Sequence, residues 1–512
     1  MKKWFTSCLL AMVVLAFVAC QKEVEMVTEL SVDKNELTLG GFIGAVDSFA
    51  ITSNKAWYIE VDSATDWLQV DVDSGTNNKT IVVRTTKELT ATAAPATLTI
   101  RSADPGQPPV TVRVVRNVTA TKVFIRLYER NDYVLFHNAV ATPDSGLIVV
   151  GITGKGVLGN LAYDGLIVRL SATGEVVWAK QLGGSQVDDF MDIVATSDGN
   201  YVAVGESQSK NGDVIGNHGA QDVWAVKFDE SGTIIWNKCF GGKLGDHIFG
   251  LGALPNGSFL MLCNTKSMEG DVPVSAPSSY YKTWITTVDA AGALQGGTII
   301  EDSTRNVFFR NLAATNDSNF IVGGFRSAMY GVESVACLVK ITPTGNILWE
   351  KRFDTGVLVP STAPVVATED GGYLMSYSQD GPQTQYYDAR FIKTDAAGNK
   401  VWEKTYGGND DEITHTMIVQ PGGKGYFAVL QTDSYEGGVP GFRGDNDIWL
   451  ANLDLAGNIK WSNPLGGSKF DIGYKIIRTA DNRFVIVGGS QSDDGDIGGV
   501  NGIFAGLIYK FE

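Results

Sequence analysis

The stretch that decides the fold is Gly183–Gly242, which reads GGSQVDDFMDIVATSDGNYVAVGESQSKNGDVIGNHGAQDVWAVKFDESGTIIWNKCFGG. One pair of apolar runs flanks the turn at Asp198-Gly199, and a second pair flanks the turn at Ser231-Gly232. Such dipeptides form tight turns between strands, and a long polar stretch separates the two pairs. The stretch therefore predicts four antiparallel strands, which is the structure of one β-propeller blade.

Related stretches recur through the rest of the chain. A Trp follows the last turn of most of them, at intervals of about 55 residues, which is the range expected of propeller repeats. These are Trp178, Trp236, Trp349, Trp402 and Trp461. We expect each Trp to pack between neighbouring blades. Seven units begin near Asp132, Gly183, Gly241, Glu301, Asp354, Gly407 and Gly466. Residues 121–512 are therefore predicted to form a seven-bladed β-propeller.

The seventh unit ends at Glu512 after its third strand. The segment 122–129, KVFIRLYE, stands alone before the first unit, and its Phe124 and Tyr128 have the spacing of Trp236 and Phe240. We predict that 122–129 supplies the fourth strand of the last blade. This pairing would close the ring and remove the open sheet edges that recruit other chains.

Residues 29–117 contain short alternating segments separated by turns, such as Trp57–Val61. This pattern predicts a small immunoglobulin-like β-sandwich. The segments AWYIEVD (56–62), DWLQVDVDSG (66–75), ATLTIRS (96–102) and VTVRVVRN (110–117) resemble the BACON domain. That family name implies carbohydrate binding, and a role as a spacer is equally open. Trp57 and Trp67 either stack on sugars or fill the core, and the core is favoured.

The first residues, MKKWFTSCLLAMVVLAFVAC, combine a basic start with an apolar run too short to span a membrane. Residues 1–19 are therefore predicted to be a signal peptide. The small residues before Cys20 resemble a lipobox, which implies that Cys20 carries the lipid anchor. Residues 20–28 form an acidic tether that resembles the export signal of surface lipoproteins. We expect a surface-exposed lipoprotein of the outer membrane; the alternative is an ordinary secretory signal with an incidental Cys.

The formal net charge of −16 argues against nucleic acid as a partner, because nucleic-acid binding needs a basic footprint. Three of the five cysteines remain once Cys8 and Cys20 are set aside. Their odd number and scattered positions imply no disulfide framework. The chain has no Cys-x-x-Cys motif and no His-rich cluster, so we expect no structural zinc. We also expect a monomer that meets the membrane through its lipid anchor only.

Candidate ligand-binding residues come from the first strand of each unit, which lines the centre of a propeller. Alignment on the Asp-Gly turns places one residue of each unit in register: His137, Met191, Phe249, Arg310, Ala363, His415 and Tyr474. We select His137, Arg310, His415 and Tyr474 as candidates. A His in a strand has the alternative of simple packing or hydrogen bonding. Tyr280 and Tyr435, in the long loops, are further aromatic candidates.

Acidic residues recur at the start of the first and third strands of the units, among them Asp188, Asp222, Asp246, Asp447 and Asp471. They either cap turns or bind Ca²⁺, and their recurrence favours turn capping. In SDDGDIGG (492–499), Asp493, Asp494 and Asp496 are candidate Ca²⁺ ligands. No other cofactor is expected.

Taken together, the residues predict a protein that binds an extracellular glycan or protein ligand through its propeller face. No catalysis is predicted, because the chain has neither a Gly-x-Ser-x-Gly nor a His-Glu-x-x-His motif. One alternative is a glycoside hydrolase or lyase whose carboxylate pair comes from different blades. Another is a structural partner in an outer-membrane complex, which would present an apolar patch.

Overall fold

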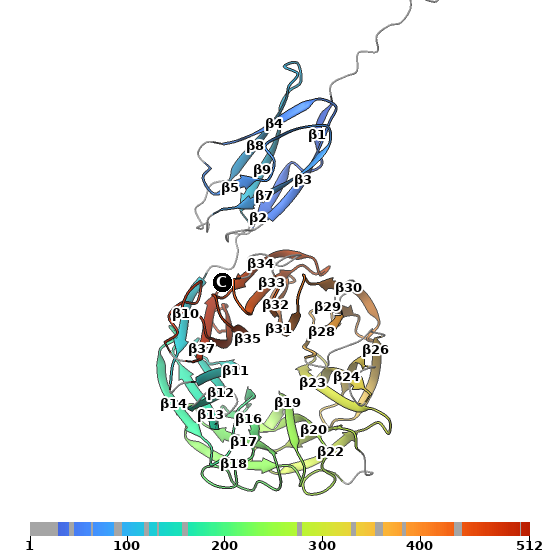
Figure 1. Ribbon diagram of the computed structural model, residues 1–512. Coiled ribbons are helices and arrows are strands. Elements are labelled where there is room, and N and C mark those ends of the chain that lie inside the picture. Colours follow the sequence, from blue (N-terminus) through green and yellow to red (C-terminus); the bar gives the residue numbers. More distant parts are fainter. Residues whose placement is uncertain are drawn as a thin grey trace, which may run out of the picture. The chain divides into compact units, whose positions relative to one another are not determined.

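The computed structural model describes residues 29–39, 46–62, 65–86, 95–116, 122–130, 133–155, 162–273, 279–328, 334–353, 362–380, 386–434, 443–501 and 503–512. The chain divides into two compact units, the first ending at Arg116 and the second running from Asn117 to Glu512. Both are built of β-strands, with one short 3-10 turn, η1 (Pro255–Gly257), in the described part (Figure 1). No helix among the described residues is long and apolar enough to cross a bilayer.

The first unit is a sandwich of two β-sheets. One sheet has the order β1 (Leu30–Val32), β3 (Val46–Ser53), β7 (Lys79–Thr85) and β5 (Leu68–Val70). The other has the order β2 (Glu36–Leu39), β9 (Val110–Arg116), β8 (Ala96–Ser102), β4 (Ala56–Val61) and β6 (Ser74–Thr76). All of these pairs are antiparallel except β2 with β9.

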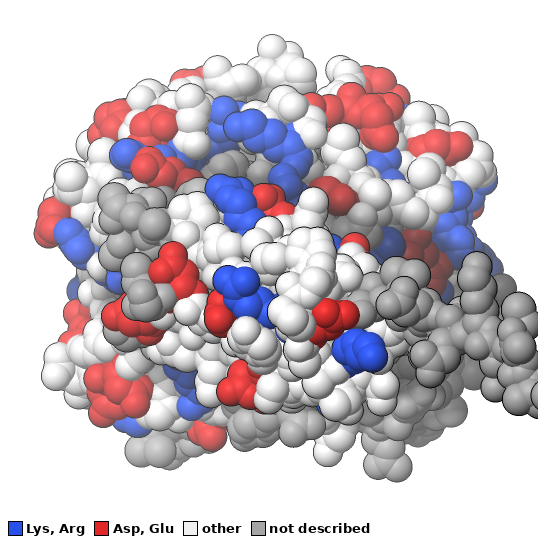
Figure 2. Space-filling view, turned by 90° about the horizontal axis from the view of Figure 1, so that it is seen from above, with Lys and Arg blue, Asp and Glu red and all other residues white. Residues whose placement is uncertain are grey.

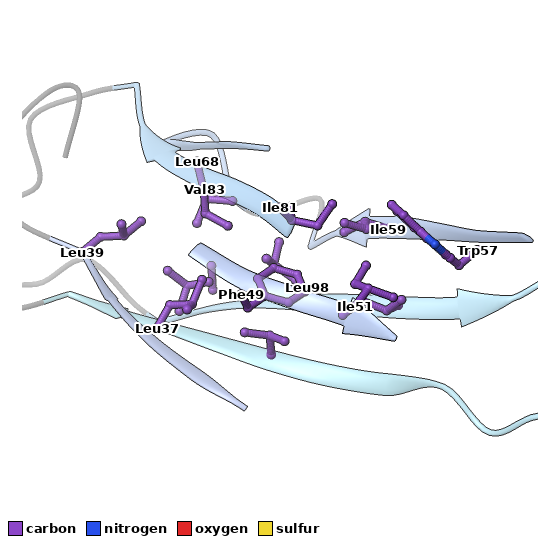
Figure 3. Close-up of a cluster of buried hydrophobic side chains, with 14 of the residues drawn as sticks. Leu37, Leu39, Phe49, Ile51, Trp57, Ile59, Leu68, Ile81, Val83 and Leu98 are labelled. Atoms are coloured by element: carbon purple, nitrogen blue, oxygen red, sulfur yellow. The ribbon is translucent and has the colours of Figure 1, made fainter. Parts of the chain in front are cut away.

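Alternate residues of these strands fill the space between the two sheets, as expected for half-buried strands. Figure 3 shows Phe49, Ile51, Ile81 and Leu98 converging there. Trp57 and Trp67 belong to the same core, with 2% and 7% of their surface exposed. The indole N–H of Trp57 donates to the Asn77 carbonyl at 2.8 Å. Both are therefore core residues, and neither presents a ring face for sugar stacking.

The second unit contains seven antiparallel sheets of four strands each, arranged as a ring (Figure 1). This confirms the predicted seven-bladed propeller. In blades one to three the strands are β11 (Tyr133–Ala141), β12 (Leu147–Lys155), β13 (Ala162–Leu170), β14 (Val176–Leu182); β15 (Asp192–Ala195), β16 (Tyr201–Ser207), β17 (Asp222–Phe228), β18 (Ile234–Phe240); and β19 (Asp246–Ala253), β20 (Phe259–Thr265), β21 (Lys282–Val288), β22 (Leu294–Ile300).

The remaining blades repeat the same order from the centre outward. Blades four to six are β23 (Asn306–Ala314), β24 (Phe320–Ser327), β25 (Ser334–Ile341), β26 (Ile347–Phe353); β27 (Val365–Ala367), β28 (Tyr373–Asp380), β29 (Tyr387–Thr394), β30 (Lys400–Tyr406); and β31 (Glu412–Gln420), β32 (Gly425–Thr432), β33 (Asp447–Leu453), β34 (Ile459–Leu465). Blade seven is β35 (Asp471–Arg478), β36 (Phe484–Ser490), β37 (Ala505–Phe511) and β10 (Lys122–Tyr128).

Blade seven joins the two ends of the propeller. Strand β10 lies antiparallel to β37, from Lys122 opposite Phe511 to Tyr128 opposite Gly506. Ile125 and Leu127 pack against the apolar core shared by blades six and seven. Phe124 and Tyr128 pack against the core shared by blades seven and one. The strand therefore contributes to both cores that flank blade seven.

The marker Trp residues connect each blade to the next. The indole N–H of Trp178 donates to the Glu230 carbonyl at 3.1 Å, and that of Trp402 donates to the Leu455 carbonyl at 3.0 Å. Trp236 makes the equivalent bond to Ala290 at 3.0 Å. Each acceptor lies in the last turn of the following blade. A Cβ atom at Gly457, in the turn beneath Trp402, would lie 2.7 Å from the Trp402 ring, so the contact requires glycine there.

Within the blades, a basic residue of the third strand is paired with the Asp of the turn between the first two strands. The Nζ of Lys227, for example, lies 2.6 Å from Asp198. Burial acts to raise the pKa of Asp198, but hydrogen bonds from Lys227 and Thr196 lower that pKa to about 2. The equivalent pairs are Arg169–Asp144, Lys340–Asp317, Lys393–Asp370 and Lys510–Asp481. In this way, ion pairs connect the turns between the first two strands to the buried third strands.

The closing strand gives a stability prediction. Leu127→Asp would place a carboxylate in the core between blades six and seven, so we expect a clear fall in the thermal unfolding temperature. Val123→Asp is the matched control, since Val123 lies on the same strand with 37% of its surface exposed. Circular dichroism melts of the two variants measure the difference. Equal unfolding temperatures would show that the pairing of β10 contributes little to the stability of the ring.

Candidate ligand site at the centre of the ring

The innermost strands of five blades carry a β-bulge at the same place. The register of β11 shifts between Phe136 and Asn138, and that of β35 shifts between Gly473 and Lys475. Strands β19, β23 and β31 shift in the same way. The bulged residues are His137, Phe249, Arg310, His415 and Tyr474. A bulge turns a side chain out of the regular alternation, and bulges occur frequently next to functional sites.

Three of these residues, from consecutive blades, form what we call the His–Tyr cluster: His137, His415 and Tyr474. The Tyr474 ring meets both imidazoles edge to face, with centroids 5.5 Å from His137 and 5.1 Å from His415. The Nδ1 of His137 lies 3.0 Å from the Phe190 carbonyl, and the Nε2 of His415 lies 3.2 Å from the Gln431 Oε1. In each case the ring N–H donates to the oxygen.

Burial keeps both imidazoles of the His–Tyr cluster neutral. It lowers the pKa of His137, and it lowers the pKa of His415 to about 4. A neutral imidazole has one N–H and one acceptor nitrogen. Because the N–H of each ring is already used, the Nε2 of His137 and the Nδ1 of His415 are the acceptors that remain for a hydroxyl group.

The second group, which we call the Arg310 cluster, consists of Lys266, Tyr281, Phe249, Phe308 and Arg310. The guanidinium carbon of Arg310 lies 4.2 Å from the centre of the Phe249 ring and 4.9 Å from that of Phe308. The Phe308 and Tyr281 ring centres are 5.2 Å apart, and the Nζ of Lys266 lies 4.3 Å from the centre of Tyr281. The cluster therefore places two cations against three aromatic rings.

A polar network lies beside the Arg310 cluster. Glu206, with 12% of its side chain exposed, has its Oε2 3.1 Å from the Nδ1 of His247 and accepts the Ile248 N–H at 3.3 Å. The Gln221 amide also donates to it. The hydrogen bond to Glu206 raises the pKa of His247. His247 in turn lies against Tyr281, with ring centres 6.0 Å apart.

A second carboxyl group accompanies Glu206. The Oδ1 of Asp189 accepts the backbone N–H of Glu206 at 2.7 Å. Burial, reinforced by the negative charge of Glu206, raises the pKa of Asp189 to about 8. The shift favours the protonated form of Asp189.

The structure places the candidate residues in two groups. His137, His415 and Tyr474 come together, and Arg310 joins Phe249 on another part of the ring. Tyr280 directly precedes Tyr281 of the Arg310 cluster, and Tyr435 lies outside the described residues. Sequence reasoning missed Glu206 and its partners. The usable signal was the second strand, where Glu206 takes the position that Ser378 and Gln431 occupy in blades five and six.

The recurring acidic residues at the start of the first strand bind the glycine-rich connection between blades. The Oδ2 of Asp246 accepts the Gly242 N–H at 2.8 Å and the Ser267 hydroxyl at 3.0 Å. The Thr265 hydroxyl also donates to Asp246. Asp188, Glu412 and Asp471 make the equivalent bonds to Gly184, Gly408 and Gly467. These are the contacts of turn capping.

The acidic residues at the start of the third strand face the same connections. Asp447 is fully buried, and its Oδ1 has no hydrogen-bond partner. A Cβ atom at Gly466 would collide with this carboxyl group, which explains the glycine at that point. Burial raises the pKa of Asp447 to about 7, and the neighbouring charge of Asp471 adds to the shift. Burial likewise raises the pKa of Asp246 to about 6 and that of Glu412 to about 7.

The candidate Ca²⁺ ligands have three separate partners. Asp493 lies 3.1 Å from the Nζ of Lys469, and Asp496 lies 2.7 Å from Nη1 of Arg443. The Oδ1 of Asp494 accepts the Ser468 N–H at 2.7 Å. Within the described ranges, no three His, Cys, Asp or Glu side chains gather in a way that would hold a metal ion. We therefore propose no metal at these residues.

No family model matches the chain, and no curated protein does. The BACON resemblance of residues 29–117 therefore stays a prediction.

Solved structures show low similarity to the chain. A Hadza microbial sialidase, Hz136, is 11% identical, with a TM-score of 0.40 over 82% of this chain and 99% of the sialidase. Polysaccharide lyase Uly1 is 8% identical, with a TM-score of 0.43 over 73% and 89%. A Bacteroides ovatus GH5 xyloglucanase in complex with a XXXG heptasaccharide is 14% identical, with a TM-score of 0.16 over 23% of this chain and 29% of its own. None of these similarities carries an argument about the ligand.

The buried carboxyl groups between blades predict a pH dependence. Because their folded-state pKa values exceed the ordinary values, the folded protein binds more protons than the unfolded chain. The free energy of unfolding should therefore fall as the pH rises from about 5 to about 8. Asp447→Asn removes one of these groups, so we expect a smaller fall and a more stable protein at the higher pH.

Thermal melts of Asp447→Asn and the unaltered protein at both pH values test this expectation. Asp493→Asn is the control, because Asp493 is exposed and paired with Lys469. An identical pH dependence in the unaltered protein and Asp447→Asn would contradict a protonated Asp447.

Proposed function

We propose that the propeller binds an extracellular glycan over the centre of its ring and does not transform it. The observation that carries the proposal is the set of five bulges, which present different side chains on a repeated backbone. Positions that only stabilise the ring keep their residue type, as Asp188, Asp246 and Asp471 do. The bulged positions instead hold imidazole, phenol, phenyl and guanidinium groups.

These groups suit the chemistry of a sugar. Aromatic rings stack on the apolar faces of pyranose rings, and sparse, well-placed polar groups fix the orientation of a ligand. Tyr474, Tyr281 and Phe308 supply rings. His137 and His415 supply acceptor nitrogens for hydroxyl groups. A protein partner would be expected to meet a broader apolar surface than these half-buried residues provide.

One observation favours a catalytic alternative, a glycoside hydrolase or lyase. The pKa of Asp189 is raised next to Glu206, and an adjacent pair of carboxyl groups is an arrangement used for acid–base catalysis. However, Asp189 is half-buried and accepts the backbone N–H of Glu206. Both residues belong to blade two, so they do not face each other from different blades. Binding alone is therefore the better supported function.

We also propose that Cys20 anchors the protein in the outer membrane with both units facing the medium. The support is the apolar segment that precedes Cys20 and the acidic stretch that follows it. Both lie outside the described residues. Several acyl chains on one Cys would retain the protein at the membrane, since each buried CH₂ contributes about 0.8 kcal/mol.

Glycan binding is tested on an array probed with residues 29–512. We expect the unaltered protein to bind at least one glycan and Tyr474→Ala to bind it about tenfold more weakly, which corresponds to the loss of one stacked ring. Tyr58→Ala is the control, because Tyr58 is an exposed aromatic residue of the sandwich. The bound glycan is recovered and analysed for cleavage.

Three results would count against this proposal. Failure to bind any glycan would refute it. Loss of binding in Tyr58→Ala with retention in Tyr474→Ala would place the site on the sandwich. Cleaved glycan, abolished by Glu206→Gln, would establish the catalytic alternative.

The membrane anchor is tested by Cys20→Ser in the producing bacterium. We expect the altered protein to leave the membrane fraction, because without acyl chains only the soluble units remain. Fractionation and immunoblotting measure the distribution, with Cys337→Ser, a buried thiol of the propeller, as the control. Retention of Cys20→Ser in the membrane would rule out the lipid anchor.

A further inference from the structure

We propose that the glycan bound at the centre of the ring carries an acidic group, a carboxylate or a sulfate ester, which pairs with Arg310. This inference rests on the function proposed above and specifies the chemistry of its ligand. Nothing in the repeat itself requires a cation at this bulge, since the equivalent residues of the other blades are His, Phe, Tyr, Met and Ala.

The first argument is that buried cations elsewhere in the propeller are paired with carboxylates. The basic side chains that are fully buried all lie next to a carboxylate: Arg169 (Asp144), Lys227 (Asp198), Lys282 (Glu301), Arg326 (Glu350), Lys393 (Asp370) and Lys510 (Asp481). This pattern follows from the high cost of removing an unpaired charge from water. Figure 2 shows the same mixing at the surface, where Lys and Arg lie among Asp and Glu.

Arg310 is half-buried, and it departs from that pattern. In the described part of the chain, no carboxylate lies within ion-pair distance of its guanidinium group, and its buried Nε has no hydrogen-bond partner. Contact with the faces of Phe249 and Phe308 offsets part of the cost of burying the charge. It supplies no acceptor for the Nε–H. Burial lowers the pKa of Arg310 to about 10, so the group is still charged at neutral pH.

Glu206, whose negative charge acts to raise the pKa of Arg310, is already hydrogen-bonded to other residues. Glu206 is bonded to His247, to the Ile248 N–H and to Gln221. A second cation, Lys266, lies over Tyr281 in the same cluster, where its contact is with the ring. The Arg310 cluster thus has two positive charges beside aromatic rings, and among the described residues the charge of Glu206 acts on Arg310 from beyond ion-pair distance.

The chemistry of the missing partner follows from the guanidinium group. Its planar edge presents parallel N–H donors that match the two oxygens of a carboxylate or a sulfate ester. The flanking rings of Phe308 and Tyr281 suit the apolar face of the sugar that bears this group. Uronic acids, sialic acids and sulfated sugars share these features.

The test compares acidic glycans with their neutralised forms. The probes are oligogalacturonate and its carboxyl-reduced form, and chondroitin sulfate and its desulfated, carboxyl-reduced form. Binding to residues 29–512 is measured by titration calorimetry. We expect the acidic member of one pair to bind about tenfold more tightly than its neutral counterpart, which is the value of a charge-assisted hydrogen bond. The pair that shows the preference identifies the acid as a carboxylate alone or as a sulfated sugar.

The variants assign that preference to Arg310. Arg310→Gln should remove the preference for the acidic form, and Arg310→Lys should reduce that preference, because an ammonium group lacks the planar edge. Arg478→Gln is the control, since Arg478 ends the innermost strand β35 and is exposed. Thermal melts establish that each variant is folded.

The outcomes separate this inference from the proposed function. Equal affinity of the unaltered protein for the acidic and neutral forms overturns the inference and leaves glycan binding in place. A preference that persists in folded Arg310→Gln and Arg310→Lys also overturns it. Failure to bind any of the four probes, together with every other glycan of the array, overturns both.

Discussion

The pairing of β10 with β37 is the interaction on which the rest of the propeller depends. These strands lie at opposite ends of the propeller sequence, and their ladder makes blade seven complete. Without it, two apolar cores would lose the side chains of Phe124, Ile125, Leu127 and Tyr128. The ladder also has a consequence at the centre of the ring. His137 lies on β11, the strand that follows β10, whereas Tyr474 and His415 come from the last two blades. The pairing of β10 with β37 therefore brings the three rings of the His–Tyr cluster together.

The molecule separates residues that hold the ring from residues that face its centre. The first kind repeats from blade to blade: the Trp bound to the next turn, the buried cation bound to the Asp-Gly turn, and the acid bound to the glycine-rich connection. The second kind varies, and it lies at bulges that turn side chains away from the sheet. A repeated frame with varied residues at one structural position allows a ligand to be recognised without loss of stability. The unpaired charge of Arg310 is the clearest departure from the repeated pattern.

Much of the fold could be predicted from the sequence because its determinants are local. Turn dipeptides, alternating strands and a Trp in five of the units are sufficient to count seven blades, and the leftover segment 122–129 indicates where the chain closes. The same alignment identified the bulged residues, because each lies at a fixed distance from an Asp-Gly turn. The parallel pairing of β2 with β9 in the sandwich was not predicted, since nothing local distinguishes it from an antiparallel pair.

The contacts of the site were less predictable, because they depend on where neighbouring blades lie. Glu206, His247 and Tyr281 come from two blades and meet only in the folded ring. Alignment of the first strands alone misses them. The missing signal lies in the second strand, where Glu206 is a carboxylate at the position that Ser378 and Gln431 occupy in blades five and six. The half-buried state of Arg310, with no carboxylate of the described residues at ion-pair distance, also has no signature in sequence, since it depends on how the strands of neighbouring blades lie.

The central claim is that a glycan binds over the bulged residues of the innermost strands. The most direct measurement is a crystal structure of residues 29–512 with the glycan that binds most tightly on an array. The account predicts electron density for the sugar against Tyr474, His415 and the rings around Arg310. Density on the outer strands of the blades or on the sandwich, with the centre of the ring occupied by solvent alone, would contradict it.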